Sequence, residues 1–454
     1  MSDKKKKKVF VIGLDCAAPR LIFDDFKKLL PNISMMIEHG VSCAMRSSDP
    51  PITIPAWMSM CSGKDAGEMG VYGFRTRKGN SYTDFDISFS HAFSGTNKIW
   101  DVLKQNNKKS ILVSVPPSFP PFEINGSMIS GFLCPDQDRD YTYPSELKQE
   151  IEKIGDGYDL DVVFRTEDRD AIKKAVWEMT EKRFKVIEYL IQNKEWAFFM
   201  FVEIGIDRIH HAFWKYFDKE HFLYEPGNTY ESVILDYYKL LDEKIGRILS
   251  LLDEDTTVFA VSDHGVKAMK GAFCLNEWLI EKGYLVLNSY PEKPVTLEKL
   301  DVDWSRSRAW GWGGYDGKIY INKKGREDHG LVKENEYEAL RDQLIRELTE
   351  EKDKDGNPWN TKIYRPETLY RSLKGNPPDL IAYFDDLAYR SAGTVGHKSL
   401  YLDENDTGPD DAMHDWNGIF IKYDPQHKEK QRLKGMCLLD FMPEVMKEFG
   451  LEEY

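Results

Sequence analysis

Residues 9–14 read VFVIGL, an apolar run rich in β-branched side chains that leads directly into Asp15. A short continuous apolar run of this kind is typical of a strand that is buried on both faces of a parallel sheet. Similar runs recur along the chain, and two of them are also followed by side chains that can bind a metal ion. These are TVFAVS (257–262) before Asp263 and His264, and WAFFMFVEI (196–204) before Asp207 and His211.

Strand-like and helix-like segments alternate along the rest of the chain. Apolar runs at 41–46, 111–115 and 380–384 are further candidate strands, and helical patterns at 171–192 and 230–252 lie between the runs. Strands alternating with helices predict a doubly wound α/β sheet. In such a sheet functional groups lie beyond the carboxyl ends of the strands, so the metal-capable residues after the apolar runs are the first candidates for a site.

Size and charge narrow the function. A chain of 454 residues has room for one large α/β domain with insertions or for two ordinary domains. With 41% hydrophobic and 13% aromatic residues it can build a sizeable core. The formal net charge of −14 argues against a surface that coats nucleic acid. An anionic substrate would therefore need local help from metal ions or from a few arginines.

The cysteines and the first residues indicate the compartment. Six scattered cysteines form no CxxC pair and are expected to be ordinary buried thiols. The beginning of the chain, a lysine-rich tail over 1–8, lacks the apolar stretch of a secretory signal, and no window has the roughly 18 apolar residues of a membrane span. We therefore expect a cytoplasmic protein without a transmembrane segment.

The metal-capable residues are each ambiguous when taken alone. Adjacent Asp263 and His264 offer a hard oxygen and an imidazole nitrogen, a mixture that suits zinc or manganese, but an isolated Asp-His-Gly is a weak signal. Asp207 and His211 would lie one turn apart on a helix that begins near Asp207, and a helix-start acid with a core histidine would give the same pattern. His414, before the apolar run 418–421, adds a third nitrogen.

Thr53 is the candidate nucleophile. It lies in DPPITIPAWMSM (49–60), where three prolines stiffen a turn before a helix-like segment. Coordination of a hydroxyl by a metal ion lowers its pKa and activates it, and the amino end of a helix favours an anion. The alternative is an ordinary threonine that caps a helix.

Six motifs together resemble the alkaline-phosphatase superfamily, and most closely its type I phosphodiesterase/nucleotide pyrophosphatase branch. They follow in the family's order across most of the chain. The motifs are GLDCAAP (13–19), LPNISMMIEHG (30–40), ITIPAWMSMCSG (52–63), EIGIDRIHH (203–211), SDHG (262–265) and GPDDAMHDWNGIF (408–420). The resemblance implies a three-layer α/β/α sandwich with a central, mostly parallel sheet. It implies one catalytic domain over 9–454, with insertions around 116–180 and 285–375.

The resemblance also implies roles for single residues. Thr53 matches the nucleophile that forms a phosphoryl-enzyme intermediate at a site with two divalent metal ions, zinc by preference, with manganese or iron as alternatives. One metal would be held by Asp15, Asp263 and His264, with Thr53 bridging toward it. The other would be held by Asp207, His211 and His414.

One departure from the family concerns the substrate. Family members hold a phosphoryl oxygen with an asparagine about twenty residues after the nucleophile, where GVYGFRTRKG (70–79) carries Phe74. Arg75 and Arg77 are candidates to replace that amide, or are surface arginines. Trp312, in WGWGGY (310–315), is a candidate for stacking on substrate, and His397 for contacting its phosphate; a structural role for each is the alternative.

The expected function is hydrolysis of a small-molecule phosphate ester, of the phosphodiesterase type. Phosphomonoester or phosphonate hydrolysis on the same fold is the alternative, and a binding protein that has lost activity is disfavoured because every ligand position is filled. A sulfatase is disfavoured because the C/S-x-P-x-R signature is missing around Thr53, and a mutase because its nucleophile is a serine in another context. The sequence leaves the substrate and the oligomeric state open.

Overall fold

A mostly parallel, 10-stranded sheet forms the centre of the fold, with the first apolar run as an inner strand. The structure is a computed structural model and describes residues 7–155 and 157–451. The strands follow one another across the sheet as β22 (Gln431–Arg432), β2 (Val41–Arg46), β21 (Asn417–Tyr423), β9 (Thr256–Val261), β1 (Lys8–Leu14), β8 (Phe198–Glu203), β5 (Ser110–Val113), β6 (Gly126–Ile129) and β7 (Thr142–Tyr143), with β23 (Met436–Cys437) also on β2.

Strand β1 is buried on both faces, as its apolar run predicts. Val9 and Val11 belong to one hydrophobic cluster, and Phe10, Ile12 and Leu14 to another on the opposite face. Its parallel neighbours β8 and β9 run in register with it, so Leu14 lies beside the last residue of β8. The carboxyl ends of these three strands therefore meet at one edge of the sheet.

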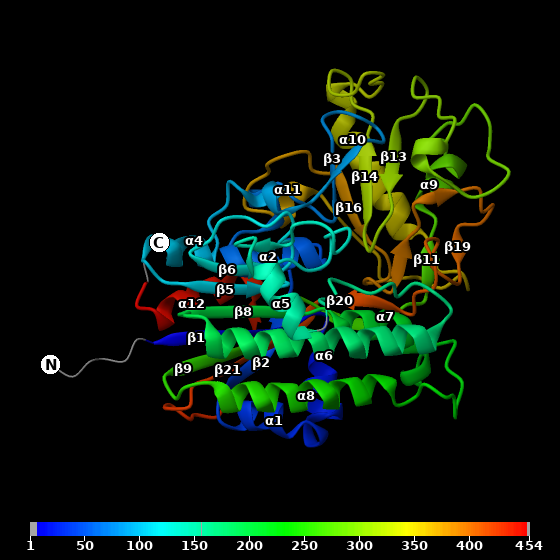
Figure 1. The fold of residues 1–454 in the computed structure, drawn as a ribbon. Coiled ribbons are helices and arrows are strands. Elements are labelled where there is room, and N and C mark those ends of the chain that lie inside the picture. The colour runs from blue at the N-terminus through cyan, green and yellow to red at the C-terminus, as the bar shows by residue number, and fades with distance from the viewer. Residues whose placement is uncertain (1–6, 156, 452–454) are drawn as a thin grey trace.

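Helices cover both faces of the sheet (Figure 1). Helices of the first layer share the cluster around Phe10, and those of the second share the cluster around Val9. The first layer contains α1 (Pro31–Glu38), α6 (Arg169–Asn193), α7 (Gly205–Phe217) and α8 (Val233–Leu251), with α5 (Leu147–Gly155) beside α6; the second contains α2 (Thr53–Ser62), α4 (Ile99–Gln105) and α12 (Phe441–Glu448). The predicted three-layer α/β/α sandwich is confirmed.

A smaller lobe stands over the carboxyl edge of the sheet, at the upper right of Figure 1. Its four-stranded sheet has its own hydrophobic cluster, which includes Trp310 and Leu344. The lobe contains β11 (Gly271–Phe273), α9 (Leu275–Glu281), β12 (Val295–Thr296), β13 (Ala309–Trp312), β14 (Gly317–Ile321), α10 (Glu334–Glu350), β15 (Lys362–Tyr364), α11 (Pro366–Leu369), β16 (Leu380–Tyr383), β17 (Tyr389–Ser391), β18 (Thr394–Val395) and β19 (Tyr401–Leu402).

The candidate strand at 380–384 belongs to this lobe and not to the central sheet. It forms β16, which pairs with β14 and β15 in antiparallel fashion. An apolar run indicates that a strand is buried, but it does not indicate in which sheet the strand lies. Most of the predicted insertion at 285–375 lies in the same lobe, whereas 116–180 adds β6 and β7 to the central sheet. The division into one domain with insertions stays a prediction.

The lysine-rich beginning is only partly described, since residues 1–6 lie outside the described residues. Lys8 is the first residue of β1, and the Lys7 Nζ donates to Asp424 at 2.9 Å. Within the described part of the chain no helix combines the length and the apolar composition that crossing a membrane requires.

Candidate metal centre

Acidic residues meet where β1 and β9 end. Asp15 follows β1 directly, and Asp263 lies two residues after the end of β9, the neighbouring parallel strand. Both are fully buried, as is His264. The backbone N–H of Cys16 donates to Asp263 Oδ1 at 3.2 Å, and the indole N–H of Trp57 donates to Asp15 Oδ2 at 2.8 Å. The ligand atoms of Asp15, Asp263 and His264 lie within 4.8 Å of one another.

A second group of three lies beside the first. Helix α7 begins at Gly205, which places Asp207 in its first turn and His211 one turn later on the same face. The third member is His414 from β20 (Ala412–Asp415), which pairs with β10 (Gly265–Ala268) just after His264. The ligand atoms of this group also lie within 4.8 Å of one another, and all three side chains are buried.

The three histidines direct the same ring nitrogen into the centre. Carbonyl oxygens only accept, so the contacts of His414 Nδ1 with Pro51 at 2.7 Å and of His264 Nδ1 with Gly265 at 3.1 Å place a proton on each Nδ1. His211 Nδ1 contacts Asp410 Oδ1 at 2.6 Å. In a neutral imidazole held this way, Nε2 keeps a lone pair, which is the arrangement of histidines that bind metals.

The donor set fits divalent metal ions. Each of the three candidate carboxylate ligands has one oxygen without a hydrogen-bond partner among the described residues, namely Asp15 Oδ1, Asp207 Oδ1 and Asp263 Oδ2. The Nε2 atoms of His211 and His414 approach each other to 3.3 Å. Buried carboxylate oxygens without a partner are costly. A cation bound by these oxygens, with the imidazole Nε2 atoms as further ligands, removes that cost.

Electrostatics point the same way. Burial raises the pKa of Asp15 well above its ordinary value, and the negative charge of Asp207 adds to the shift. Burial likewise raises the pKa of Asp263, with Asp15 as the next cause. The three carboxylates thus carry more negative charge than the surrounding protein compensates. Arg208 donates to Asp207 Oδ2 at 2.6 Å and is the arginine that pairs with them.

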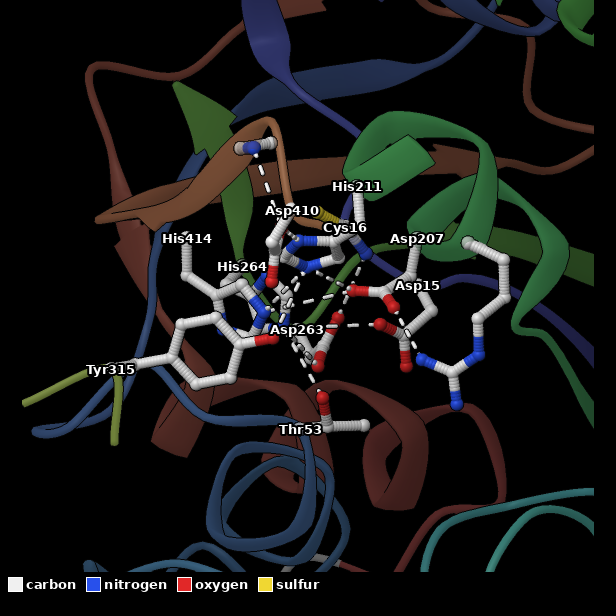
Figure 2. A network of polar contacts seen from close by, with 12 residues as sticks. Asp15, Cys16, Thr53, Asp207, His211, Asp263, His264, Tyr315, Asp410 and His414 are labelled. Atoms are coloured by element: carbon white, nitrogen blue, oxygen red, sulfur yellow. Dashed lines mark hydrogen bonds and ion pairs between the residues drawn. The ribbon is translucent and has the colours of Figure 1, made fainter. Parts of the chain in front are cut away.

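Thr53 lies below both groups of candidate ligands (Figure 2). It is the first residue of α2, is 3% exposed, and its Oγ1 lies 3.4 Å from His264 Nε2. The N-cap position of α2 belongs to Ile52, and no side chain caps the helix. The capping role considered for Thr53 is therefore not what its side chain does.

A pocket of about 460 Å³ opens in front of Thr53, Asp207 and His414. Phe74, from the segment 70–79, lines it, and Trp312 lines it from the smaller lobe. The pocket therefore lies between the central sheet and that lobe, with both contributing to its walls.

Two arginines considered as substrate contacts differ in their surroundings. Arg75 lines the pocket, is exposed, and lies over the ring of Phe85 at 4.3 Å. Arg77 is 4% exposed, pairs with Glu327 at 3.0 Å, and is not among the pocket's lining residues. His397 is also outside the lining and contacts Thr394 Oγ1 through Nε2 at 2.7 Å.

Two residues that contact the candidate ligands, Asp410 and Tyr315, were not assigned this role from the sequence. Asp410 orients His211, and the OH of Tyr315 lies 3.3 Å from His211 Nε2 while its ring stacks on His414 at 3.9 Å. Burial opposes ionisation of Asp410, but the positive charge of His211 and of nearby arginines holds its pKa well below the ordinary value. Asp410 lies inside the motif 408–420, four residues before His414, so its place in that motif was the sequence signal for it.

The central sheet between two helical layers, with candidate ligands at its carboxyl edge, defines an alkaline-phosphatase-like hydrolase fold. The chain belongs to the type I phosphodiesterase / nucleotide pyrophosphatase family, whose sequence profile matches residues 9–410. The members of this family are metal-dependent hydrolytic enzymes. The predicted family and enzyme class are therefore confirmed.

Similar solved structures share this fold at low sequence identity. The human ectonucleotide pyrophosphatase / phosphodiesterase 5 is 13% identical with a TM-score of 0.58, over 98% of this chain and 95% of that chain. The murine protein is 14% identical with a TM-score of 0.57, over 98% and 95%. An inactive variant of the murine protein in complex with AMP is 14% identical with a TM-score of 0.56, over 98% and 96%. No curated protein sequence matches the chain.

Proposed function

We propose that the protein hydrolyses phosphodiesters by a double displacement in which Thr53 is the nucleophile. The observation that carries this proposal is the position of Thr53, whose Oγ1 lies at the candidate ligand His264 and faces the pocket. In the first step Oγ1 loses its proton to solvent and forms a bond to phosphorus, while the bond from phosphorus to the leaving oxygen breaks and that oxygen takes up a proton from solvent. In the second step water attacks the same phosphorus, the bond to Oγ1 breaks, and the hydroxyl is restored.

Divalent ions at the two ligand groups would lower the pKa of the Thr53 hydroxyl and offset the charge of the phosphoryl oxygens. Asp15, Asp263 and His264 would hold one ion, and Asp207, His211 and His414 the other. Three carboxylates with three imidazoles suit zinc, which we propose as the native metal, and also accept manganese or iron. The residues themselves fix the imidazole orientation and bury the carboxylates.

A phosphodiester is preferred over a monoester because most of the cationic groups near the reacting centre are already paired. Arg208 is shared between Asp207 and Asp161, and Lys318 contacts both oxygens of Asp316 at 2.7 and 2.8 Å. The free positive charge near the reacting centre is therefore too small to balance the two negative charges of a phosphomonoester. Monoester or phosphonate hydrolysis remains the alternative within the same fold.

The test is a hydrolysis panel with metal-depleted protein reloaded with zinc, manganese or iron. We expect bis-nitrophenyl phosphate to be cleaved with a higher kcat/KM than nitrophenyl phosphate or a nitrophenyl phosphonate. The Thr53→Ala protein, purified in parallel, is the control for contaminating phosphatases. If the monoester is preferred by about tenfold or more in kcat/KM, the diester assignment is wrong; if nothing in the panel is cleaved with any metal, the hydrolytic proposal fails.

The proposed location is the cytoplasm. Its support is that all six cysteines are free thiols, five of them buried, which suits a reducing compartment. Fractionation of the native cells with antibodies against the protein would test the location.

A further inference from the structure

One buried cationic side chain in the pocket has guanidinium N–H groups that donate no hydrogen bond. Of the five lysine and arginine side chains that line the pocket, Arg208 and Lys318 have the carboxylate partners given above, and Arg75 is exposed. Arg165 donates to Asp410 Oδ2 through Nη2 at 2.9 Å and through Nε at 3.2 Å. The fifth is Arg390, in the middle of β17.

Arg390 is buried without a hydrogen-bond acceptor. Arg390 is 8% exposed, and neither its Nε nor its Nη1 has a hydrogen-bond partner among the described residues. The nearest acid is Asp410, whose Oδ2 lies 3.8 Å from Nη1 and already accepts both hydrogen bonds from Arg165. The other oxygen of Asp410 is engaged by His211. One carboxylate thus faces two guanidinium groups, and buried charged donors without an acceptor are costly.

The guanidinium group lies close to the reacting centre but not in it. Arg390 lies over the ring of Tyr315 at 4.6 Å, and the same ring stacks on His414 at 3.9 Å. His414 in turn stacks on His264 at 3.7 Å. Arg390 is therefore separated from the candidate metal ligands by one aromatic ring. An anion at Arg390 would be a different group from the phosphoryl group at Thr53.

Two acidic side chains of the pocket lining have other partners than Arg390. Asp406 lines the pocket, but its Oδ2 accepts from the N–H groups of Gly393 and Thr394 at 2.8 and 3.1 Å. Asp316 is held by Lys318. None of the described lining residues accepts a hydrogen bond from Arg390 Nε or Nη1, so a molecule bound in the pocket can supply that acceptor.

We propose that Arg390, assisted by Arg165, binds a second anionic group of the substrate. The substrate class is a phosphoester with a carboxylate or a further phosphate on one of its ester arms, held on the far side of Tyr315 from the reacting phosphorus. This inference rests on the proposed function and narrows its substrate. The planar fork of Arg390 suits a carboxylate or phosphate group in two-point contact.

Two matched diesters test the proposal. Nitrophenyl propyl phosphate and nitrophenyl carboxypropyl phosphate release the same phenol and differ in the charge of the retained arm. We expect wild-type protein to prefer the carboxylate-armed diester by about tenfold to a hundredfold in kcat/KM, mainly through KM, as for a charged hydrogen bond in a buried site. Arg390→Met should abolish this preference, and Arg390→Lys should restore part of it.

The matched control is Arg341→Met. Arg341, in α10, is 3% exposed and also has a buried Nε without a partner, but it pairs with Glu367 and lies outside this pocket. Arg341→Met should leave the ratio of kcat/KM between the two diesters unchanged, even if the melting temperature falls. Metal content and melting temperature, measured on every variant, separate a loss of binding from a loss of folding.

The possible outcomes are distinguishable. Equal cleavage of both diesters by wild type, or equal losses for both in Arg390→Met, overturns the second-anion site while the proposed hydrolysis stands. Calorimetric binding of the two diesters to Thr53→Ala and Thr53→Ala/Arg390→Met proteins measures the same preference without turnover. If wild type cleaves neither diester, the proposed function fails, and this binding comparison still decides the anion site: a preference abolished by Arg390→Met supports it, and no preference overturns it.

Discussion

At the scale of single residues, the oxygen atoms that hold the histidine rings matter as much as the rings themselves. His264 and His414 are oriented by backbone carbonyl groups, whereas His211 is oriented by the carboxylate of Asp410. A charged acceptor raises the basicity of the imidazole that it holds. Only the ring of His211 is held by a side chain. A substitution outside the ligand set can therefore change its affinity for a metal, whereas the other two rings are held by the backbone.

The first prediction follows from this contact. Asp410→Asn should lower the affinity of the second metal by about 10- to 100-fold, because the neutral amide no longer raises the basicity of the His211 imidazole. Competition against a chelating indicator measures the affinity. Asp242→Asn is the control. Asp242 is also buried, at 2% exposed, but it lies outside the candidate centre and accepts hydrogen bonds from Asn32 and Ile33. Equal metal affinities for the Asp410 variant and wild type would contradict the role of this contact.

The second prediction concerns Thr53. Thr53→Ala should lower kcat by orders of magnitude and leave metal content largely intact, because it removes the proposed nucleophile. Thr53→Ser should keep part of the activity, since the hydroxyl remains and only the methyl that restricts its rotamer is lost. A threonine with a purely structural role would behave differently, with about 1 kcal/mol of stability lost and turnover near normal. Turnover and melting temperature measured on the same variants separate the two roles.

At the scale of elements, the start of α7 sets the position of two candidate ligands. Gly205 is its first residue, and a Cβ added there would lie 1.9 Å from the OH of Tyr237 and 2.8 Å from Glu203 Oε1. Tyr237 is buried in α8, and Glu203 forms a fully buried ion pair with Arg183 at 2.9 Å. Both neighbours are buried, so any side chain larger than that of glycine at this position requires Tyr237, Glu203 or α7 to shift.

The third prediction uses this close approach. Gly205→Ala should destabilise the protein by about 1–3 kcal/mol, as overpacking of a core does. It should also weaken metal binding at Asp207 and His211, because α7 must shift to admit the methyl group. Gly95→Ala is the control, since no atom lies within 4 Å of the added Cβ at that position. Denaturant unfolding and metal titration check both effects; an unchanged stability would show that Tyr237 yields without cost.

At the scale of the whole molecule, the candidate centre joins segments that lie far apart in the chain. Its ligands follow β1 and β9 or lie in α7 and β20, and they range from Asp15 to His414. A metal that binds the folded chain and not the unfolded one adds its binding free energy to the stability of the fold. The whole sheet edge, and not one local loop, should therefore respond to the metal.

The fourth prediction is a metal-dependent stability. Loading zinc at about 100 times the dissociation constant should stabilise the protein by about 2.7 kcal/mol per site, and a chelator should reverse the effect. Thermal melts with and without metal, with elemental analysis of the loaded protein, provide the measurement; we expect up to two metals per chain. Asp15→Asn combined with Asp207→Asn should abolish most of the shift. A melting temperature that responds to neither metal nor chelator, with no metal retained, would refute the two-site proposal.

The sequence by itself determined the architecture and the set of candidate ligands. The run 41–46 forms β2 over the same residues, and 257–262 forms β9 (Thr256–Val261) with a shift of one residue. Such agreement is expected, because burial on both faces of a sheet is written locally as a continuous apolar run. The position of metal-capable residues directly after these runs, in the family's order, then led to both ligand groups.

Only the tertiary structure decided which charged groups meet. Arg77 pairs with Glu327, 250 residues away in sequence, while Arg75, two residues earlier, faces the pocket. Asp410 is shared by Arg165 and His211, and Arg390 is left without an acceptor. The apolar run of β16 likewise joined the smaller lobe and not the central sheet. The physical reason is common to all of these: local sequence encodes whether a segment is buried, but a charge finds its partner through contacts that the folded chain alone brings together.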